Sequence, residues 1–153
     1  MTHKTMAHRT STLERTYAAS PARVFRAWED PDVRRIWGSP SDEVQIRNEA
    51  ADFRVGGEDI QLCMVGDDAV ARVVGRYLDI VPDARIVYSE AISEGDTLLG
   101  VSQVSAEFIA AGSGTRLVLT LQTVAVDGSD LLDGVAEGWT SALDRLAQQF
   151  VSA

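Results

Sequence analysis

The chain has 153 residues, and its hydrophobic fraction of 45% and charged fraction of 24% are ordinary for a globular protein of one domain. Its formal net charge of −9 disfavours binding to nucleic acid or to an anionic membrane, and no run approaches the roughly 18 consecutive apolar residues that span a bilayer. Cys63 is the only cysteine, which excludes an internal disulfide and a metal cage of several cysteines.

Residues 1–9 are polar and lack the apolar core of a signal peptide. We therefore expect residues 1–9 to form a flexible leader, residues 10–153 to form a single domain, and the protein to be cytoplasmic. His3 and His8 are the only histidines, and both fall in this leader. Their position excludes a catalytic histidine or a histidine metal site inside the fold.

Two short helices are expected near the start of the chain. Alternation over residues 10–17 first predicts a strand with one buried face. The pair Ser20-Pro21 then supplies a cap and a first helical residue for a helix that reaches Trp28. Asp30-Pro31 begins a second helix, which ends at Trp37 before a Gly-Ser-Pro segment.

The middle of the chain is expected to form strands, and its end one long helix. Period-two patterns separated by short turns predict strands near 43–47, 60–64, 70–81, 85–92, 98–109 and 115–124. No helix lies between them, so the sheet is an antiparallel meander. Apolar residues spaced by three or four predict a helix from Asp130 to Phe150 with one apolar stripe. The fold class is therefore α+β, with a curved antiparallel sheet wrapped around a long C-terminal helix.

Four segments carry a family resemblance, and they occur in order over nearly the whole chain. They are Arg15-Thr16-Tyr17 with the two helix starts that follow it, Phe53-Arg54-Val55-Gly56-Gly57, Gly75 to Pro82, and Gly114-Thr115-Arg116-Leu117 with Gly138-Trp139. Together they resemble the START-like (helix-grip, SRPBCC) superfamily, and within it the heat-shock-protein-90 ATPase-activator-homologue group.

The resemblance implies a helix-grip fold more firmly than it implies an activity. Members of the superfamily bind lipids, sterols, polyketides or plant hormones, some act as cyclases or dehydratases, and others contact chaperones. A histidine often found shortly before the Gly-Trp pair is absent here, where the run is Gly134-Val135-Ala136-Glu137. This departure weakens any interpretation that needs a basic group in the cavity.

The leading hypothesis is that a small apolar or aromatic molecule binds between the long helix and the concave sheet, in a pocket of roughly 300–1,000 Å³. The expected wall residues are Trp37, Phe53, Leu62, Met64, Tyr88, Val104, Leu119, Trp139 and Leu143. For Trp28 and Trp139 ordinary core packing is favoured over a place in the cavity wall, whereas Trp37 is as well suited to the rim of a cavity mouth as to the core.

Polar residues on apolar strand faces are the further candidates. Arg15 shares a face with Leu13 and Tyr17, and Glu90 shares a face with Tyr88. Either could orient the polar end of a ligand or act as an acid or base, but an internal ion pair or a strand end that reaches solvent explains both equally well. Arg34-Arg35 could recognise an anionic ligand at the rim or form a solvated helix face.

Two alternatives to ligand binding remain open. One is a protein-interaction module, either co-chaperone-like or a homodimer, which predicts a filled interior and a contiguous exposed apolar patch. The other, ranked last, is an enzyme of the cyclase or dehydratase type, which needs an interior acid–base pair. No phosphate loop or dinucleotide fingerprint occurs, and the aspartate-rich segments fall at caps and turns, so we expect no cofactor and no metal.

Overall fold

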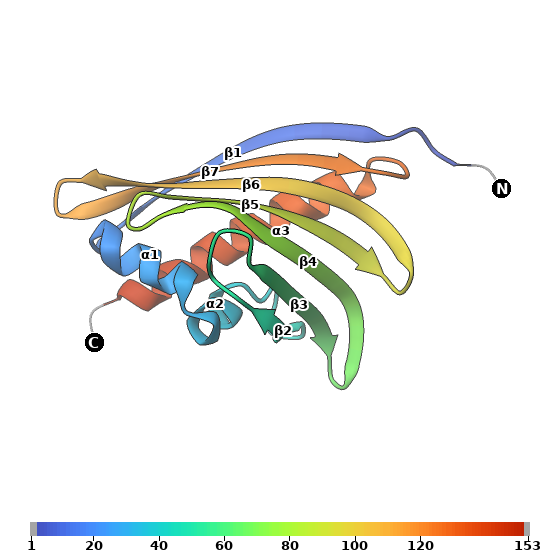
Figure 1. The fold of residues 1–153 in the computed structure, drawn as a ribbon, viewed down its shortest axis with the longest axis horizontal. Coiled ribbons are helices and arrows are strands. Elements are labelled where there is room, and N and C mark those ends of the chain that lie inside the picture. The colour runs from blue at the N-terminus through green and yellow to red at the C-terminus, as the bar shows by residue number, and fades with distance from the viewer. Residues whose placement is uncertain (1–2, 152–153) are drawn as a thin grey trace.

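Seven antiparallel strands form one strongly curved sheet in the computed structural model, which describes residues 3–151. The sheet order is β1-β7-β6-β5-β4-β3-β2, and α3 runs along its concave face while α1 and α2 lie at one end (Figure 1). In chain order the elements are β1 (Ala7–Tyr17), α1 (Pro21–Glu29), α2 (Pro31–Trp37), β2 (Gln45–Ala51), β3 (Glu58–Val65), β4 (Asp68–Val81), β5 (Arg85–Glu94), β6 (Thr97–Ala111), β7 (Gly114–Ala125), α3 (Asp130–Leu146) and a 3₁₀ turn (Ala147–Phe150).

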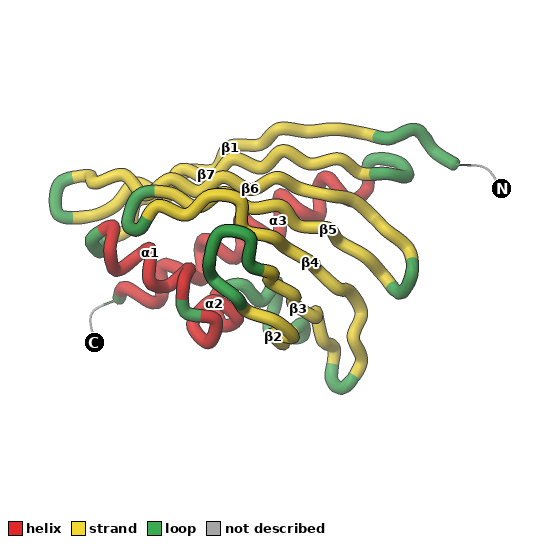
Figure 2. Tube along the Cα trace, viewed as in Figure 1, coloured by secondary structure: helices red, strands yellow, loops and turns green. Residues whose placement is uncertain are grey.

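The predicted α+β helix-grip architecture is confirmed, including its antiparallel meander. Strands β2 to β7 pair with their neighbours in sequence, and β1 pairs with β7, so β1 and β2 are the two edge strands (Figure 2). Several boundaries differ by a few residues from the expectation, among them those nearest the two ends of the chain. Strand β1 begins at Ala7, so residues 7–9 of the expected leader belong to the sheet, and α3 ends at Leu146 with a 3₁₀ turn in place of further α-helix.

The two short helices begin at the caps that the sequence indicates. The Ser20 hydroxyl accepts a hydrogen bond from the Arg23 amide at 3.3 Å, and the Asp30 carboxylate accepts one from the Asp32 amide at 3.0 Å. Each cap satisfies an N–H that has no partner inside its helix. Since both helices are anchored this way, α1 and α2 hold their aromatic residues at the end of the sheet.

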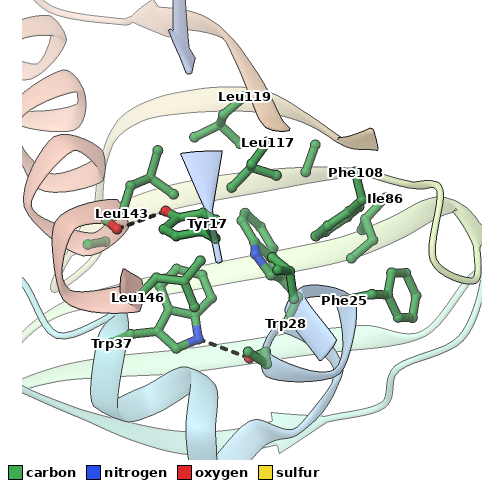
Figure 3. Close-up of a cluster of buried hydrophobic side chains, with 14 of the residues drawn as sticks. Tyr17, Phe25, Trp28, Trp37, Ile86, Phe108, Leu117, Leu119, Leu143 and Leu146 are labelled. Carbon is green, nitrogen blue, oxygen red and sulfur yellow. Dashed lines mark hydrogen bonds between the residues drawn. The ribbon is translucent and has the colours of Figure 1, made fainter. Parts of the chain in front are cut away.

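The hydrophobic core lies under one half of the sheet. Residues of β1, β6 and β7 pack there against α1 and against the last turns of α3 (Figure 3). Fully buried members include Val104, Leu117, Leu119, Leu143 and Leu146. The other half of the concave face, formed by β2 to β5, therefore has to be covered by α2 and by the first turns of α3.

Gly100 allows the start of α3 to approach the sheet. A Cβ atom at this position would overlap the Leu131 side chain and the main-chain carbonyl of Val124. A residue without a Cβ atom is therefore required where α3 crosses β6. No helix within residues 3–151 is long and apolar enough to cross a membrane.

Candidate functional site

A cavity of about 270 Å³ lies between α3 and the half of the concave face that β2 to β5 provide. Six aromatic side chains form much of its wall: Trp28, Trp37, Phe53, Tyr77, Tyr88 and Trp139. The volume falls just below the usual range of ~300–1,000 Å³ for small-molecule sites. The cavity is therefore slightly smaller than the pocket expected from the sequence.

The aromatic side chains of the wall form two groups of contacting rings. The ring of Trp139 stacks on that of Trp28 with centroids 5.7 Å apart and planes inclined by 12°. Trp37 lies beside Trp28 with a centroid separation of 4.9 Å. On the sheet side, the ring of Tyr77 contacts that of Phe53 edge-on, with centroids 4.9 Å apart. The ring of Tyr88 is tilted against that of Tyr77, with centroids 5.6 Å apart. These separations fall within the range of about 4.5–7 Å for favourable aromatic pairs, so the rings stabilise one another.

Trp37 is part of the buried wall and not an exposed rim. Its side chain is 1% exposed, and its indole Nε1 donates a hydrogen bond of 2.9 Å to the main-chain carbonyl of Ala27 (Figure 3). This bond joins the end of α2 to α1. The ring is thereby fixed in orientation where it lines the cavity.

The Gly56-Gly57 turn attaches the segment between β2 and β3 to Tyr77. The Gly56 amide donates to the Tyr77 carbonyl at 2.8 Å, and the Tyr77 amide donates to the Gly57 carbonyl at 3.1 Å. A Cβ atom on Gly57 would overlap the main-chain carbonyl of Asp52, and Gly56 has a φ of +83°. Glycine is therefore required at both positions, and the turn holds Phe53 over Tyr77.

The polar end of the cavity contains a buried ion pair. The Arg34 guanidinium donates to the Asp59 carboxylate and to the Tyr77 hydroxyl, and the side chains of Arg34 and Asp59 are only 11% and 15% exposed. Burial by itself would lower the pKa of Arg34, but the charges of Tyr77 and Asp59 outweigh it and raise that pKa. Burial raises the pKa of Asp59, and the charge of Arg34 opposes part of that increase. Arg34 thus acts as a structural cation.

Glu90 is the second carboxyl group on the cavity wall. Burial raises its pKa from 4.5 to about 7, the charge of Asp59 adds to the increase, and a hydrogen bond from the Trp139 side chain opposes it. Burial, followed by the charge of Glu90, also raises the pKa of the adjacent Tyr88 hydroxyl well above its usual value. Glu90 therefore changes its charge near neutral pH, whereas Tyr88 stays protonated.

Two glycines of α3 leave space on the helix face toward the cavity. Gly134 and Gly138 both line it, and a Cβ atom at either position would meet no other atom within 4 Å. Glycine in the interior of a helix costs roughly 0.5–1 kcal/mol relative to alanine. Here the missing side chains enlarge the cavity, so these positions act on its volume directly.

Seven of the residues singled out in the sequence line the cavity together: Trp28, Arg34, Trp37, Phe53, Tyr88, Glu90 and Trp139. Leu62 and Met64 were expected on the cavity wall, and this prediction is wrong because both lie on the opposite face of β3. Strand β3 turns Asp59, Gln61 and Cys63 toward the cavity instead. Leu62 lies on the other face between Arg47 and Arg72 in the neighbouring strands. The long side chains of these arginines explain why Leu62 is buried outside the concavity.

The other predicted wall residues belong to different parts of the structure. Val104, Leu119 and Leu143 are fully buried in the solid core and not in the cavity wall. Arg15 lies on the same face as Tyr17, as expected, but its Nε donates to the Asp144 carboxylate on α3 at 3.1 Å. The arrangement found for Arg15 is an ion pair that reaches solvent and not an internal one, since the side chains of Arg15 and Asp144 are 29% and 65% exposed.

Sequence reasoning missed several cavity residues. The main ones are Asp59, Gln61, Tyr77 and Gly138, together with the pairing of Arg34 with Asp59. Tyr77 and Gly138 lie inside the segments that carry the family resemblance, which is the one signal that could have indicated them. Burial raises the pKa of the Cys63 thiol, and a thiol in that state is a poor nucleophile. Within residues 3–151 no group of three or more His, Cys, Asp or Glu side chains is placed to hold a metal ion.

Comparison with known proteins agrees with this architecture. A family model described as activator of Hsp90 ATPase homolog 1-like protein matches residues 18–150. The Mll3558 protein from Rhizobium loti is 37% identical, with 94% of this chain and 98% of that chain covered and a TM-score of 0.83. A protein from Rhizobium leguminosarum is 33% identical, with 96% and 97% covered and a TM-score of 0.84. No curated protein sequence matches the chain.

Proposed function

The chain belongs to the family of activator of Hsp90 ATPase homolog 1-like proteins, and we propose that within this family it binds a small apolar or aromatic molecule between α3 and the sheet. The observation that carries the proposal is the cavity of about 270 Å³, with aromatic side chains on its wall and polar groups gathered at one end. Such a division suits a molecule with one apolar and one polar end. Burial of apolar surface would drive binding, and the polar end would fix orientation.

The size of the cavity limits the molecule. An apolar cavity of about 150 Å³ is enough to hold benzene, so about 270 Å³ suits a molecule of one or two rings. A sterol or a long fatty acid needs more space than this. Among the ligand classes implied by the superfamily, the small aromatic ones are therefore favoured.

Calorimetric titration with compounds of one and two aromatic rings tests the proposal. We expect saturable binding to the wild-type protein and strong loss of affinity in Gly138→Leu, which places a side chain in the cavity. Glu137→Leu is the matched control, because it adds the same side chain at an exposed position of α3. Unfolding temperatures of both variants show that the fold is kept. Absence of binding by every compound, or equal affinity in Gly138→Leu, would contradict the proposal.

An interaction module is supported less well by the same structure. It predicts a filled interior, whereas the cavity leaves space beside α3. It also predicts a contiguous apolar patch. The large exposed apolar side chains of the described residues are spread over α2, the loop before β3, the β3–β4 hairpin, β4, β6 and both ends of the chain: Met6, Ile36, Val55, Val65, Val70, Leu78, Leu98, Ile109 and Val151. We therefore rank a co-chaperone-like or homodimeric role below ligand binding.

Glu90 supports catalysis as a second candidate function. Its pKa of about 7 suits a group that exchanges a proton near neutral pH, and it lies in the cavity beside the Tyr88 hydroxyl. A β-hydroxy aryl ketone is a suitable probe, because loss of water yields a conjugated enone that absorbs in the near ultraviolet. Enone formation by the wild type and not by Glu90→Gln would establish a dehydratase, and no turnover would leave binding as the function.

A further inference from the structure

We propose that the molecule held in the cavity is an organic cation, a small arylalkyl amine whose ammonium group pairs with the Glu90 carboxylate. This inference rests on the proposed function and names the chemical class of its ligand. It follows from the charges on the cavity wall, from the free acceptor positions of Glu90, and from the rings around it.

The charges on the wall leave one group without a counter-ion. Among the described residues that line the cavity, Arg34, Asp59 and Glu90 are the charged ones. Arg34 is already paired with Asp59 and also donates to the Tyr77 hydroxyl. Its remaining Nε is buried away from solvent and has no partner. An anionic ligand would therefore find no available cation, whereas an ionised Glu90 leaves one negative charge to be neutralised.

Glu90 also has acceptor positions to spare. A carboxylate offers about four acceptor positions, and the side-chain donor that contacts Glu90 is Trp139. Its register partner on β6 is Ser102, whose hydroxyl is hydrogen-bonded to that of Thr123 at 2.9 Å. The unused acceptor positions are therefore available to a donor that enters from the cavity, and an ammonium group brings three donors.

The aromatic wall suits a cation as well as an apolar ring. A cation is attracted to the face of an aromatic ring within about 6 Å, and tryptophan is the strongest such partner. Trp139 both contacts Glu90 and lines the cavity, and its stacked partner Trp28 continues the same wall. An ammonium group at Glu90 would thus lie beside the indole of Trp139, with its aryl group directed along the apolar part of the cavity.

The groups around Glu90 indicate how binding depends on pH. The titratable and charged groups that share the cavity wall with it and interact with its charge are Asp59 and Cys63 from β3, Arg34 from α2, Tyr77 from β4 and Tyr88 from β5. Burial raises the pKa of Cys63, Tyr77 and Tyr88, so these three stay neutral near pH 7, and Arg34 stays charged beside Asp59. Glu90 is then the group of this set that titrates near neutral pH, while an alkylammonium stays protonated.

Two triads of matched compounds test the inference by calorimetry. Phenethylamine, phenethyl alcohol and hydrocinnamic acid share one ring, and tryptamine, tryptophol and indolepropionic acid share an indole. At about pH 8 we expect each amine to bind at least about tenfold tighter than its alcohol, and the acids to bind most weakly. From about pH 6 to about pH 8, amine affinity should rise about tenfold, because a carboxyl with a pKa of about 7 becomes ionised over that range.

Variants assign the preference to Glu90. Glu90→Gln should bind amine and alcohol equally and without dependence on pH, whereas Glu107→Gln, an exposed change on β6, should behave as the wild type. The pH dependence of the wild type keeps the test decisive if Glu90→Gln folds poorly. Alcohols or acids that bind as tightly as the amines would overturn the inference and leave the proposed function intact. Failure of all six compounds to bind would overturn both.

Discussion

The hydroxyl of Tyr17 donates a hydrogen bond of 2.8 Å to the main-chain carbonyl of Leu143, and so joins the last residue of β1 to the last turns of α3 (Figure 3). Carbonyls in the last turn of a helix lack a regular partner inside it. Both side chains are buried, with Tyr17 4% and Leu143 0% exposed. The contact therefore fixes α3 over the solid half of the core and leaves its first turns to cover the cavity.

Removal of the hydroxyl in Tyr17→Phe should lower the free energy of unfolding by about 1–2 kcal/mol, because the buried Leu143 carbonyl loses its donor while the ring packing is kept. Urea unfolding followed by circular dichroism measures the change. Thr12→Ser, an exposed change on the same strand, serves as the control and should stay within about 0.5 kcal/mol of the wild type. A Tyr17→Phe variant as stable as the wild type would show that the bond contributes nothing net.

Removal of one partner of the Arg34–Asp59 pair should destabilise the protein strongly, whereas replacement of both partners by apolar residues should destabilise it little. Arg34→Met leaves the Asp59 carboxylate buried without its cation, and we expect a loss of about 3–5 kcal/mol in the free energy of unfolding. The double variant Arg34→Met/Asp59→Leu should recover most of that loss, because it removes both buried charges. Urea unfolding of the two single variants and the double variant gives the coupling energy. Additive losses in the double variant would show that the two side chains act independently.

The ionisation of Glu90 should make the protein less stable as pH rises. The folded-state pKa of about 7 lies above the ordinary value of 4.5, so the folded protein binds more protons than the unfolded chain between these values. The contribution of Glu90 to the free energy of unfolding therefore falls as pH rises through this window, by up to about 1.4 kcal/mol per pH unit, and is constant above it.

Comparison with Glu90→Gln isolates this contribution from that of other carboxyl groups. Urea unfolding at several values between about pH 5 and about pH 8 should show the wild type losing stability relative to Glu90→Gln. Glu107→Gln should follow the wild type, since that side chain is exposed. Parallel pH profiles for wild type and Glu90→Gln would mean that Glu90 titrates near its ordinary pKa.

Substitution by alanine should have opposite effects on stability at Gly138 and at Gly100. Gly138→Ala places a methyl group in open space inside a helix, so we expect about 0.5–1 kcal/mol of added stability together with weaker binding in the smaller cavity. Gly100→Ala forces a methyl group against Leu131 and the Val124 carbonyl, and we expect a loss of about 1–3 kcal/mol. Thermal unfolding of the two variants distinguishes them. Destabilisation by Gly138→Ala would show that its side of α3 is closely packed.

Local patterns were sufficient for the elements because the signals that form them are local. The caps at Ser20 and Asp30 contact amides only three and two residues away. Alternation in β5 was sufficient to place Tyr88 and Glu90 on one face, and both line the cavity. Alternation in β3 was equally clear, but it led to the wrong face for Leu62 and Met64. A two-residue period defines two faces without stating which one lies inside.

The amino-acid sequence by itself determined the order of helices and strands, the helix-grip family and a set of aromatic side chains able to line a cavity, because spacing, caps and turns act between near neighbours. Only the tertiary structure decided which of those side chains meet around open space. It directed Arg34 to Asp59, turned the apolar face of β3 outward beneath Arg47 and Arg72, and left Glu90 without a counter-ion on the cavity wall. These outcomes depend on contacts between residues distant in sequence, where burial and charge pairing compete.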